Sequence, residues 1–347
     1  MNPFKKYQRA ASLLFLFVLL LTGCGDAGKD HFTLAGSTMG TTYHITVLER
    51  EGSKTNQQEL QQAVDQQLLL INQQMSTYQD DSELAKFNQA LVGEWVNVSA
   101  NLFDILVMSM ELGWLTGGAF DITVGPLVNL WGFGPGGLDM PSKVPDADNI
   151  KVLLAQGGFQ AIELGLANNS IRKTKPVILD LSGIAKGYGV DKVAELLIYA
   201  GYTDFMVEIG GELRLAGNNP RGTPWTIAIE QPDADTFGQA HAAVKVSGAA
   251  MATSGDYRNY FEQNGKRYSH TINPTTGYPI DHSLASITVI ADSSAYADGL
   301  ATALNVLGAP KALQLAEQQG LAIYMLVKTD QGFEAQYSEA FKPYLQQ

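Results

Sequence analysis

The sequence is short of cysteine and of basic side chains. Its 347 residues include one cysteine, Cys24, and 23 lysines and arginines against 35 aspartates and glutamates, so the formal net charge is −12. One cysteine cannot form a disulfide within the chain. The negative balance argues against nucleic-acid binding, because such binding depends on lysine and arginine neutralising phosphates. An anionic substrate would therefore need positive charge supplied locally, by a metal ion or by helix N-termini.

The sequence also lacks a hydrophobic run long enough to cross a membrane. The apolar stretch 11–21 follows a basic segment and is shorter than the ~20 residues of a transmembrane helix, which is typical of a secretory signal. Cys24 then stands in Leu-Thr-Gly-Cys, a pattern that resembles the bacterial lipobox, whose cysteine becomes the lipidated N-terminus. We therefore predict a lipoprotein signal at 1–23, lipidation at Cys24, a polar tether at 24–33 and one folded domain at 34–347. The alternative is an ordinary signal followed by a free thiol.

Loss of the signal would change the charge and the chemistry of the mature chain. The signal contains three basic residues and no acidic one, so its removal leaves a formal charge of −15. Lipidation of the only cysteine would leave no thiol nucleophile.

The remaining sequence alternates helical and strand-like segments. Asn56 is placed to cap a long amphipathic helix, a strand-like run occupies 41–49, and short β-like runs dominate after residue 159. Among these runs, 177–182 is predicted to be a strand that ends at Asp180. Hairpin-like strands with helices between them predict an α+β fold with mixed, mostly antiparallel sheets. The segments with apolar residues at helical spacing are 56–75, 100–115, 184–200, 294–307 and 310–319.

The segment SSAYADGLATALNVLG, residues 293–308, places a carboxylate on an otherwise apolar helix. Asp298 and Thr302 are four residues apart, so they share one face of that helix. A buried carboxylate is costly unless a cation meets it. Mg²⁺ prefers oxygen ligands, and Asp298, the Thr302 hydroxyl and a carbonyl from the turn at 182–186 would suit it. The alternative is that Asp298 pairs with a lysine while Thr302 bonds back to its own helix.

Three other features place polar or aromatic groups beside the ends of strands or helices. In DLSGIAKGYGVD, residues 180–191, a turn leads into a helix whose first turn contains Lys186, which suits an anion. Neither glycine fingerprint for nucleotide binding is present there. His270 could act as a base near neutral pH, and Tyr78 could stack on a ring ligand. Taken singly, each feature also has a structural explanation: a capped turn, a structural histidine and a packed ring.

Eight segments, in their order along the chain, resemble the ApbE family of FAD:protein FMN transferases. They span residues 36–308 and read GSTMGTTY, MSTYQDDSEL, GAFDITVGPL, DLSGIAKGYGVD, EIGGELR, TSGDYRNYF, SHTINPTTGYP and DGLATALNVLG. The resemblance implies an ApbE-like, T-fold-like architecture, with FAD bound and cleaved at its pyrophosphate in the presence of Mg²⁺. FMN would be joined through its phosphate to a threonine or serine hydroxyl of an acceptor protein, and AMP would be released.

The resemblance also implies partners and a location. The implied acceptors are subunits of the Na⁺-translocating NADH:quinone reductase and of Rnf-type electron-transport complexes. The lipid anchor would hold the protein at the periplasmic face of the bacterial membrane, the inner membrane in preference to the outer.

Roles for individual residues follow from the same resemblance. The implied metal ligands are Asp298, Thr302 and the backbone carbonyl of Gly183. His270 is implied to activate the acceptor hydroxyl, which makes His270 and Asp298 the predicted catalytic residues. The residues implied to contact FAD are Met39, Tyr78 (stacked on the flavin), Ala119, Phe120, Asp121, Asp180, Lys186 and Ile272.

Two positions depart from the pattern of the family. Many members carry an aspartate where this chain has Asn273, and some carry an acidic residue in place of Lys186. Two other functions fit the same residues: a Mg²⁺-dependent FAD pyrophosphatase that uses water instead of a protein hydroxyl, and a lipoprotein that binds flavin without chemistry.

Overall fold

Strand β1 is the first element of the residues that the structure describes. The computed structural model describes residues 29–49, 56–135, 144–232, 239–255 and 259–345, so the predicted signal and Cys24 lie outside the described residues. Strand β1, His31–Thr38, starts inside the segment predicted as a tether, because His31 pairs with Leu48 of the next strand. No helix in these described ranges is long and apolar enough to span a membrane.

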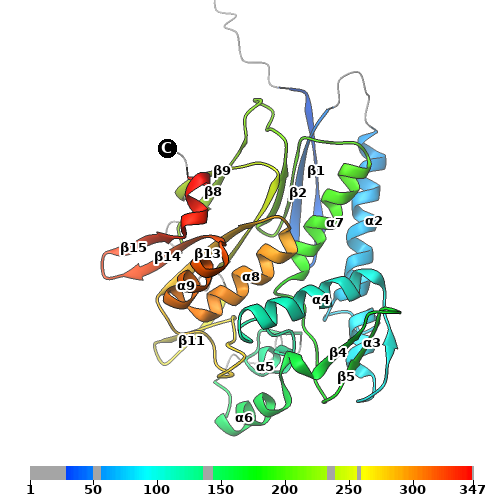
Figure 1. Cartoon of the computed structure of the whole chain (residues 1–347), viewed down its shortest axis with the longest axis vertical. Helices are drawn as coiled ribbons and strands as arrows, with labels where there is room; N and C mark the ends of the chain where they lie inside the picture. The colour runs from blue at the N-terminus through cyan, green and yellow to red at the C-terminus, as the bar shows by residue number, and fades with distance from the viewer. Residues whose placement is uncertain (1–28, 50–55, 136–143, 233–238, 256–258, 346–347) are drawn as a thin grey trace, which may run out of the picture.

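An eight-stranded antiparallel sheet forms the centre of the structure (Figure 1). Its strands lie in the order β1-β2-β6-β7-β10-β13-β14-β15, and every neighbouring pair is antiparallel. The predicted α+β class with mostly antiparallel sheets is confirmed. After β1, the strands of this sheet are β2 Thr41–Leu48, β6 Phe205–Ile209, β7 Glu212–Ala216, β10 Ala249–Gly255, β13 Leu284–Ala291, β14 Ala322–Thr329 and β15 Gly332–Tyr337.

The smaller sheets are also antiparallel. In one of them, β5 Ser170–Lys173 lies between β3 Val96–Asn97 and β4 Ile162–Gly165. In the other two, β8 Trp225–Glu230 pairs with β9 Ala240–Val246, and β11 Tyr260–Gln263 pairs with β12 Lys266–Ser269. The α-helices are α2 Gln57–Met75, α3 Glu83–Gln89, α4 Ala100–Leu115, α5 Gly125–Leu130, α6 Ala147–Gln156, α7 Ala185–Tyr199, α8 Ser294–Leu307 and α9 Ala309–Gln319. Short 3₁₀ helices occupy Phe159–Ala161 and Glu339–Tyr344.

The central sheet is covered on both faces. Helices α2, α7 and α8 pack against one face (Figure 1), where α2 and α7 share a core with β1, β2 and β6. The β8–β9 hairpin and the last 3₁₀ helix cover the other face through Trp225, Ile229 and Phe341. Strand β13 is buried along nearly its whole length, because it is covered on both faces: Ile287 faces the helices and Ile290 the hairpin.

The predicted helices agree closely with the observed ones, and the side chain of Asn56 caps α2 by accepting a hydrogen bond from the Glu59 N–H at 3.3 Å. The strand predicted at 177–182 is wrong. The N–H and carbonyl of Leu179 bond to the side-chain amide of Asn88 at 2.8 and 3.0 Å. The N–H of Asp180 donates to a loop carbonyl. Alternate residues of the segment are buried as in a strand, but their backbone groups are satisfied by a side chain and a loop.

Candidate active site

A cavity of about 570 Å³ lies where α8, the start of α7, the start of β7, the end of β10, strand β8 and several loops meet. These elements are far apart in the sequence, so only the fold brings their side chains together. Of the residues predicted for a site, those that line the cavity are Tyr78, Ala119, Phe120, Asp121, Asp180, Gly183, Lys186, His270, Ile272, Asp298 and Thr302.

Met39 is the predicted contact residue that does not line this cavity. It lies in the turn between β1 and β2, with a positive φ of 50°. Its terminal methyl group lies over Gly189 of α7, where a Cβ would come within 2.9 Å of it. The β1–β2 turn therefore directs Met39 onto a helix rather than into the cavity.

Helices α7 and α8 cross at very short range beside the cavity. A Cβ on Gly187 would lie 2.3 Å from the carbonyl oxygen of Ser294, so only glycine allows this approach. Ile184, at the N-cap of α7, provides no side-chain cap. The carboxylate of Asp298 takes that role from α8, since its Oδ2 accepts a hydrogen bond from the Gly187 N–H at 3.0 Å. The crossing thus fixes Asp298 at the start of α7.

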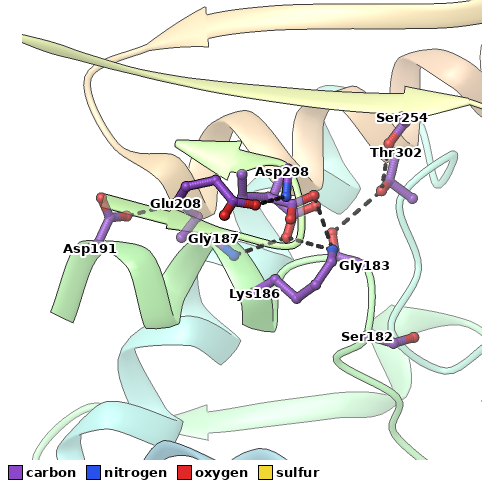
Figure 2. Close-up of polar contacts among 12 residues, drawn as sticks. Ser182, Gly183, Lys186, Gly187, Asp191, Glu208, Ser254, Asp298 and Thr302 are labelled. Carbon is purple, nitrogen blue, oxygen red and sulfur yellow. Dashed lines mark hydrogen bonds and ion pairs between the residues drawn. The ribbon is translucent and has the colours of Figure 1, made fainter. Parts of the chain in front are cut away.

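Four oxygen-bearing residues gather at this crossing (Figure 2). Thr302 Oγ1 lies 3.4 Å from the carbonyl oxygen of Gly183 and 3.3 Å from Ser254 Oγ. Asp298 is 3% exposed, and no described residue donates a hydrogen bond to its Oδ1. A carboxylate, a hydroxyl and a carbonyl are the oxygen donors that Mg²⁺ prefers. No group of three or more histidine, cysteine, aspartate or glutamate side chains suited to a metal occurs among the described residues.

Lys186 extends from the first turn of α7 between two buried carboxylates. Its Nζ lies 3.1 Å from Glu212 Oε1 and 3.7 Å from Asp298 Oδ2. Burial lowers the pKa of Lys186, but the two carboxylates outweigh it and raise the pKa, so the lysine stays cationic. Burial raises the pKa of Glu212 and of Asp298, and the ammonium group opposes that rise in both. The sequence left open the alternative that Asp298 pairs with a lysine while Thr302 bonds back to its own helix. The first part of that alternative is present, because Lys186 lies beside Asp298.

His270 has a defined tautomer in this structure. Its Nδ1 lies 3.0 Å from the backbone carbonyl of Asn259, which can only accept, so Nδ1 carries the proton. In neutral histidine, Nε2 is then an acceptor. Burial lowers the pKa of His270, the bond to Asn259 opposes this, and the positive charge of Lys186 lowers it further. At neutral pH the ring is neutral and able to take a proton.

The segment that follows His270 forms a tight turn. Asn273 Oδ1 accepts a hydrogen bond from the Thr275 N–H at 2.9 Å, and the Trp131 indole N–H donates to the Gly277 carbonyl at 2.8 Å. An uncharged amide performs this role as well as a carboxylate would. The turn also holds Ile272, 5% exposed, against the cavity.

Two aspartates of the cavity wall are used to fix loops. Asp121 Oδ1 accepts from the backbone and the hydroxyl of Thr123 at 2.8 and 2.7 Å, and its Oδ2 accepts from the Phe159 N–H at 3.1 Å. Burial raises the pKa of Asp121, and these hydrogen bonds oppose the rise. Asp180 Oδ1 accepts from the Ser182 N–H at 2.8 Å and so shapes the turn that leads into α7.

Tyr78 stands at the rim of the cavity with 61% of its surface exposed, whereas Phe120 and Ala119 are buried in the wall. An exposed aromatic ring beside a concave site is available to stack on a planar ligand.

Several residues that line the cavity were not predicted from the sequence, and two of them lie beside Lys186 and Thr302. Glu212 and Ser254 both line the cavity, and Glu212 is only 4% exposed. A signal existed for Glu212, because it starts strand β7 directly after Gly210–Gly211. Both glycines have positive φ, which marks a tight β6–β7 turn. Ser254 carried no comparable signal.

Comparisons with known proteins show the family of the chain. Residues 39–325 match the model of the ApbE family. The proteins named FAD:protein FMN transferase from Haemophilus influenzae and Vibrio cholerae are each 46% identical to the chain. The alignments cover 93% and 94% of this chain and 94% and 96% of those proteins.

Solved structures agree as well. The flavin transferase ApbE from Vibrio cholerae superposes with a TM-score of 0.84 at 44% identity, over 91% of this chain and 99% of that one. The apo flavinyl transferase ApbE of Pseudomonas stutzeri gives 0.84 at 39% identity, over 92% and 98%. The fold is that of a transferase. The chain belongs to the ApbE family.

Proposed function

We propose that this chain transfers FMN from FAD to a threonine or serine hydroxyl of an acceptor protein and releases AMP. The observation that carries the proposal is the meeting of Asp298, Thr302 and the Gly183 carbonyl in the same cavity as the unprotonated Nε2 of His270. The names of the relatives from Haemophilus influenzae and Vibrio cholerae support this reaction and this donor.

The oxygen donors at the α7–α8 crossing fit Mg²⁺. Asp298 has an oxygen without a hydrogen-bond donor among the described residues, and the Thr302 hydroxyl and Gly183 carbonyl lie beside each other. We propose that these three residues hold the ion. When bound, Mg²⁺ would offset charge on the pyrophosphate and make AMP a better leaving group.

His270 is proposed as the general base. The hydroxyl oxygen of the acceptor attacks the phosphorus on the FMN side of the pyrophosphate. The bond from that phosphorus to the bridging oxygen breaks, and AMP departs with the bond's electrons. The hydroxyl proton passes to Nε2 of His270, whose Nδ1–H stays bonded to the Asn259 carbonyl. The products are the FMN phosphoester, AMP and one proton.

Other cavity residues are proposed to bind and orient FAD. Tyr78 at the rim is placed to stack on a flavin ring. Lys186 supplies positive charge near the pyrophosphate, which a chain of formal charge −12 needs locally. Ala119, Phe120, Asp121, Asp180 and Ile272 form the wall.

We also propose the partners and location that the sequence implies. The pattern Leu-Thr-Gly-Cys supports lipidation at Cys24 and attachment at the periplasmic face of the membrane. Subunits of the Na⁺-translocating NADH:quinone reductase and of Rnf-type complexes are the proposed acceptors.

One experiment separates transfer from the other two functions. The protein is incubated with FAD, Mg²⁺ and an acceptor subunit of the reductase, and the acceptor is then weighed by mass spectrometry. We expect a gain equal to FMN less one water, with AMP formed in equal amount. Free FMN and AMP with an unchanged acceptor would instead identify a pyrophosphatase, and intact FAD would identify a flavin-binding protein.

A further inference from the structure

Glu212 is a buried carboxylate to which the proposed reaction assigns no role. It begins β7, directly after the Gly210–Gly211 turn, and is 4% exposed. Its Oε1 faces Lys186, while its Oε2 is buried without a hydrogen-bond partner among the residues that the structure describes. A carboxylate in that state is costly, so its position calls for a reason.

Glu212 and Asp298 do not share Lys186 equally. The Nζ of Lys186 lies within hydrogen-bond distance of Glu212 Oε1, at 3.1 Å, but 3.7 Å from Asp298 Oδ2, which is too long for such a bond. Asp298 Oδ2 instead accepts the Gly187 N–H. The ammonium group therefore lies closer to Glu212 than to Asp298.

The same arrangement determines whether Lys186 competes with a metal ion for the carboxylate of Asp298. A lysine has a flexible stem and a compact charge, so without Glu212 the Nζ would close onto Asp298. A cation bonded to Asp298 would repel a second cation at the same carboxylate. We propose that Glu212 is a positioning residue that holds Lys186 away from Asp298 and so keeps Asp298 available to a divalent cation. This inference rests on the proposed Mg²⁺ site.

A double-mutant cycle tests the inference without the reaction. Wild type, Glu212→Gln, Lys186→Met and the double variant are titrated with Mg²⁺ in a calorimeter in the absence of FAD. Glu212→Gln keeps the shape but removes the charge, and we expect affinity for Mg²⁺ to fall about tenfold. In the Lys186→Met background the same change should have no effect, because no ammonium remains to be held.

A simpler explanation makes a different prediction. If Glu212 only attracts Mg²⁺ through its own charge, Glu212→Gln weakens binding equally in both backgrounds, and that result would overturn the proposal. Glu208→Gln is the matched control. Glu208 lies on the neighbouring strand β6 and is bonded to the Gly211 N–H at 2.7 Å and to His44 at 3.0 Å, rather than to Lys186. We expect this variant to bind Mg²⁺ as wild type does.

Failure of the metal site itself would look different. If wild type binds Mg²⁺ no better than Asp298→Asn, the proposed site and this inference are both refuted. If wild type binds Mg²⁺ saturably but the effects of Glu212→Gln and Lys186→Met on its affinity simply add, the inference alone is refuted. Circular dichroism melts check that each variant folds. Glu212→Asp keeps the charge on a shorter side chain, so its affinity should lie between those of wild type and Glu212→Gln. Wild-type affinity in Glu212→Gln would also overturn the proposal.

Discussion

Asp191 of α7 and Asp298 of α8 each cap the helix of the other. Asp298 accepts the Gly187 N–H of α7, and Asp191 accepts the N–H groups of Ser294 and Ala295 of α8 at 2.9 and 2.8 Å. A carboxylate at a helix N-terminus satisfies free N–H groups and complements the helix dipole. This exchange locks the crossing of the two helices, and the crossing positions Thr302 beside the Gly183 carbonyl.

Removal of the Asp298 charge should abolish FMN transfer. Asp298→Asn retains an oxygen that can accept the Gly187 N–H, so the fold should survive. The loss of the only carboxylate among the proposed ligands should lower the transfer rate at least about 100-fold, because metal stabilisation of the transition state contributes several kcal/mol. The measurement is the initial rate of acceptor labelling at saturating FAD. Asp292→Asn, an exposed site just before α8, removes an equal charge and should keep the wild-type rate.

The pH dependence of transfer should reflect His270. Its pKa is lowered by burial, and only the neutral ring can accept a proton. The rate should therefore hold at neutral pH and fall as the pH drops through a value below the ordinary histidine pKa of ~6.5. His270→Gln should slow transfer about 100-fold or more and remove this acidic limb, with FAD binding unchanged. If the fall in rate at low pH persists in His270→Gln, a group other than His270 causes it. His241→Gln is the control and should keep the wild-type pH profile.

Tyr78 should contribute to FAD binding through its ring rather than its hydroxyl. Tyr78→Ala should weaken FAD binding about tenfold, since aromatic stacking contributes ~1 kcal/mol beyond burial. Tyr78→Phe should bind almost as wild type does. Quenching of flavin fluorescence measures both. Equal loss in the two variants would contradict stacking. Tyr199→Ala, at a residue of α7 that is 96% exposed, controls for loss of a surface tyrosine.

The close crossing of α7 and α8 should make Gly187 sensitive to any side chain. In Gly187→Ala the new Cβ would meet the Ser294 carbonyl at 2.3 Å, and a backbone atom cannot rotate away. We expect a loss of about 3 kcal/mol in the free energy of unfolding, at the upper end for overpacking. Urea unfolding measures it. Gly157→Ala, whose Cβ would have its nearest neighbour at 3.5 Å, should cost much less.

The sequence by itself determined much of the local structure. Helical spacing gave the bounds of α2, α4 and α7 closely, because each of these helices buries one face. The bounds of α8 also agree, although that helix is buried on nearly all sides. The spacing of four between Asp298 and Thr302 also placed them on one helix face, since that depends only on helix geometry. The run 177–182 shows the limit of such patterns: alternation indicates burial, but whether the backbone pairs with a strand depends on a distant residue such as Asn88.

The tertiary structure alone decided what surrounds Asp298. The approach of α7 at Gly187 brings Lys186 to it, and the β6–β7 turn brings Glu212 to Lys186. Residue 298 is more than 80 positions from Glu212 and more than 100 from Lys186, so no local pattern links them. Long-range packing sets these distances, and distance and burial decide which charges pair.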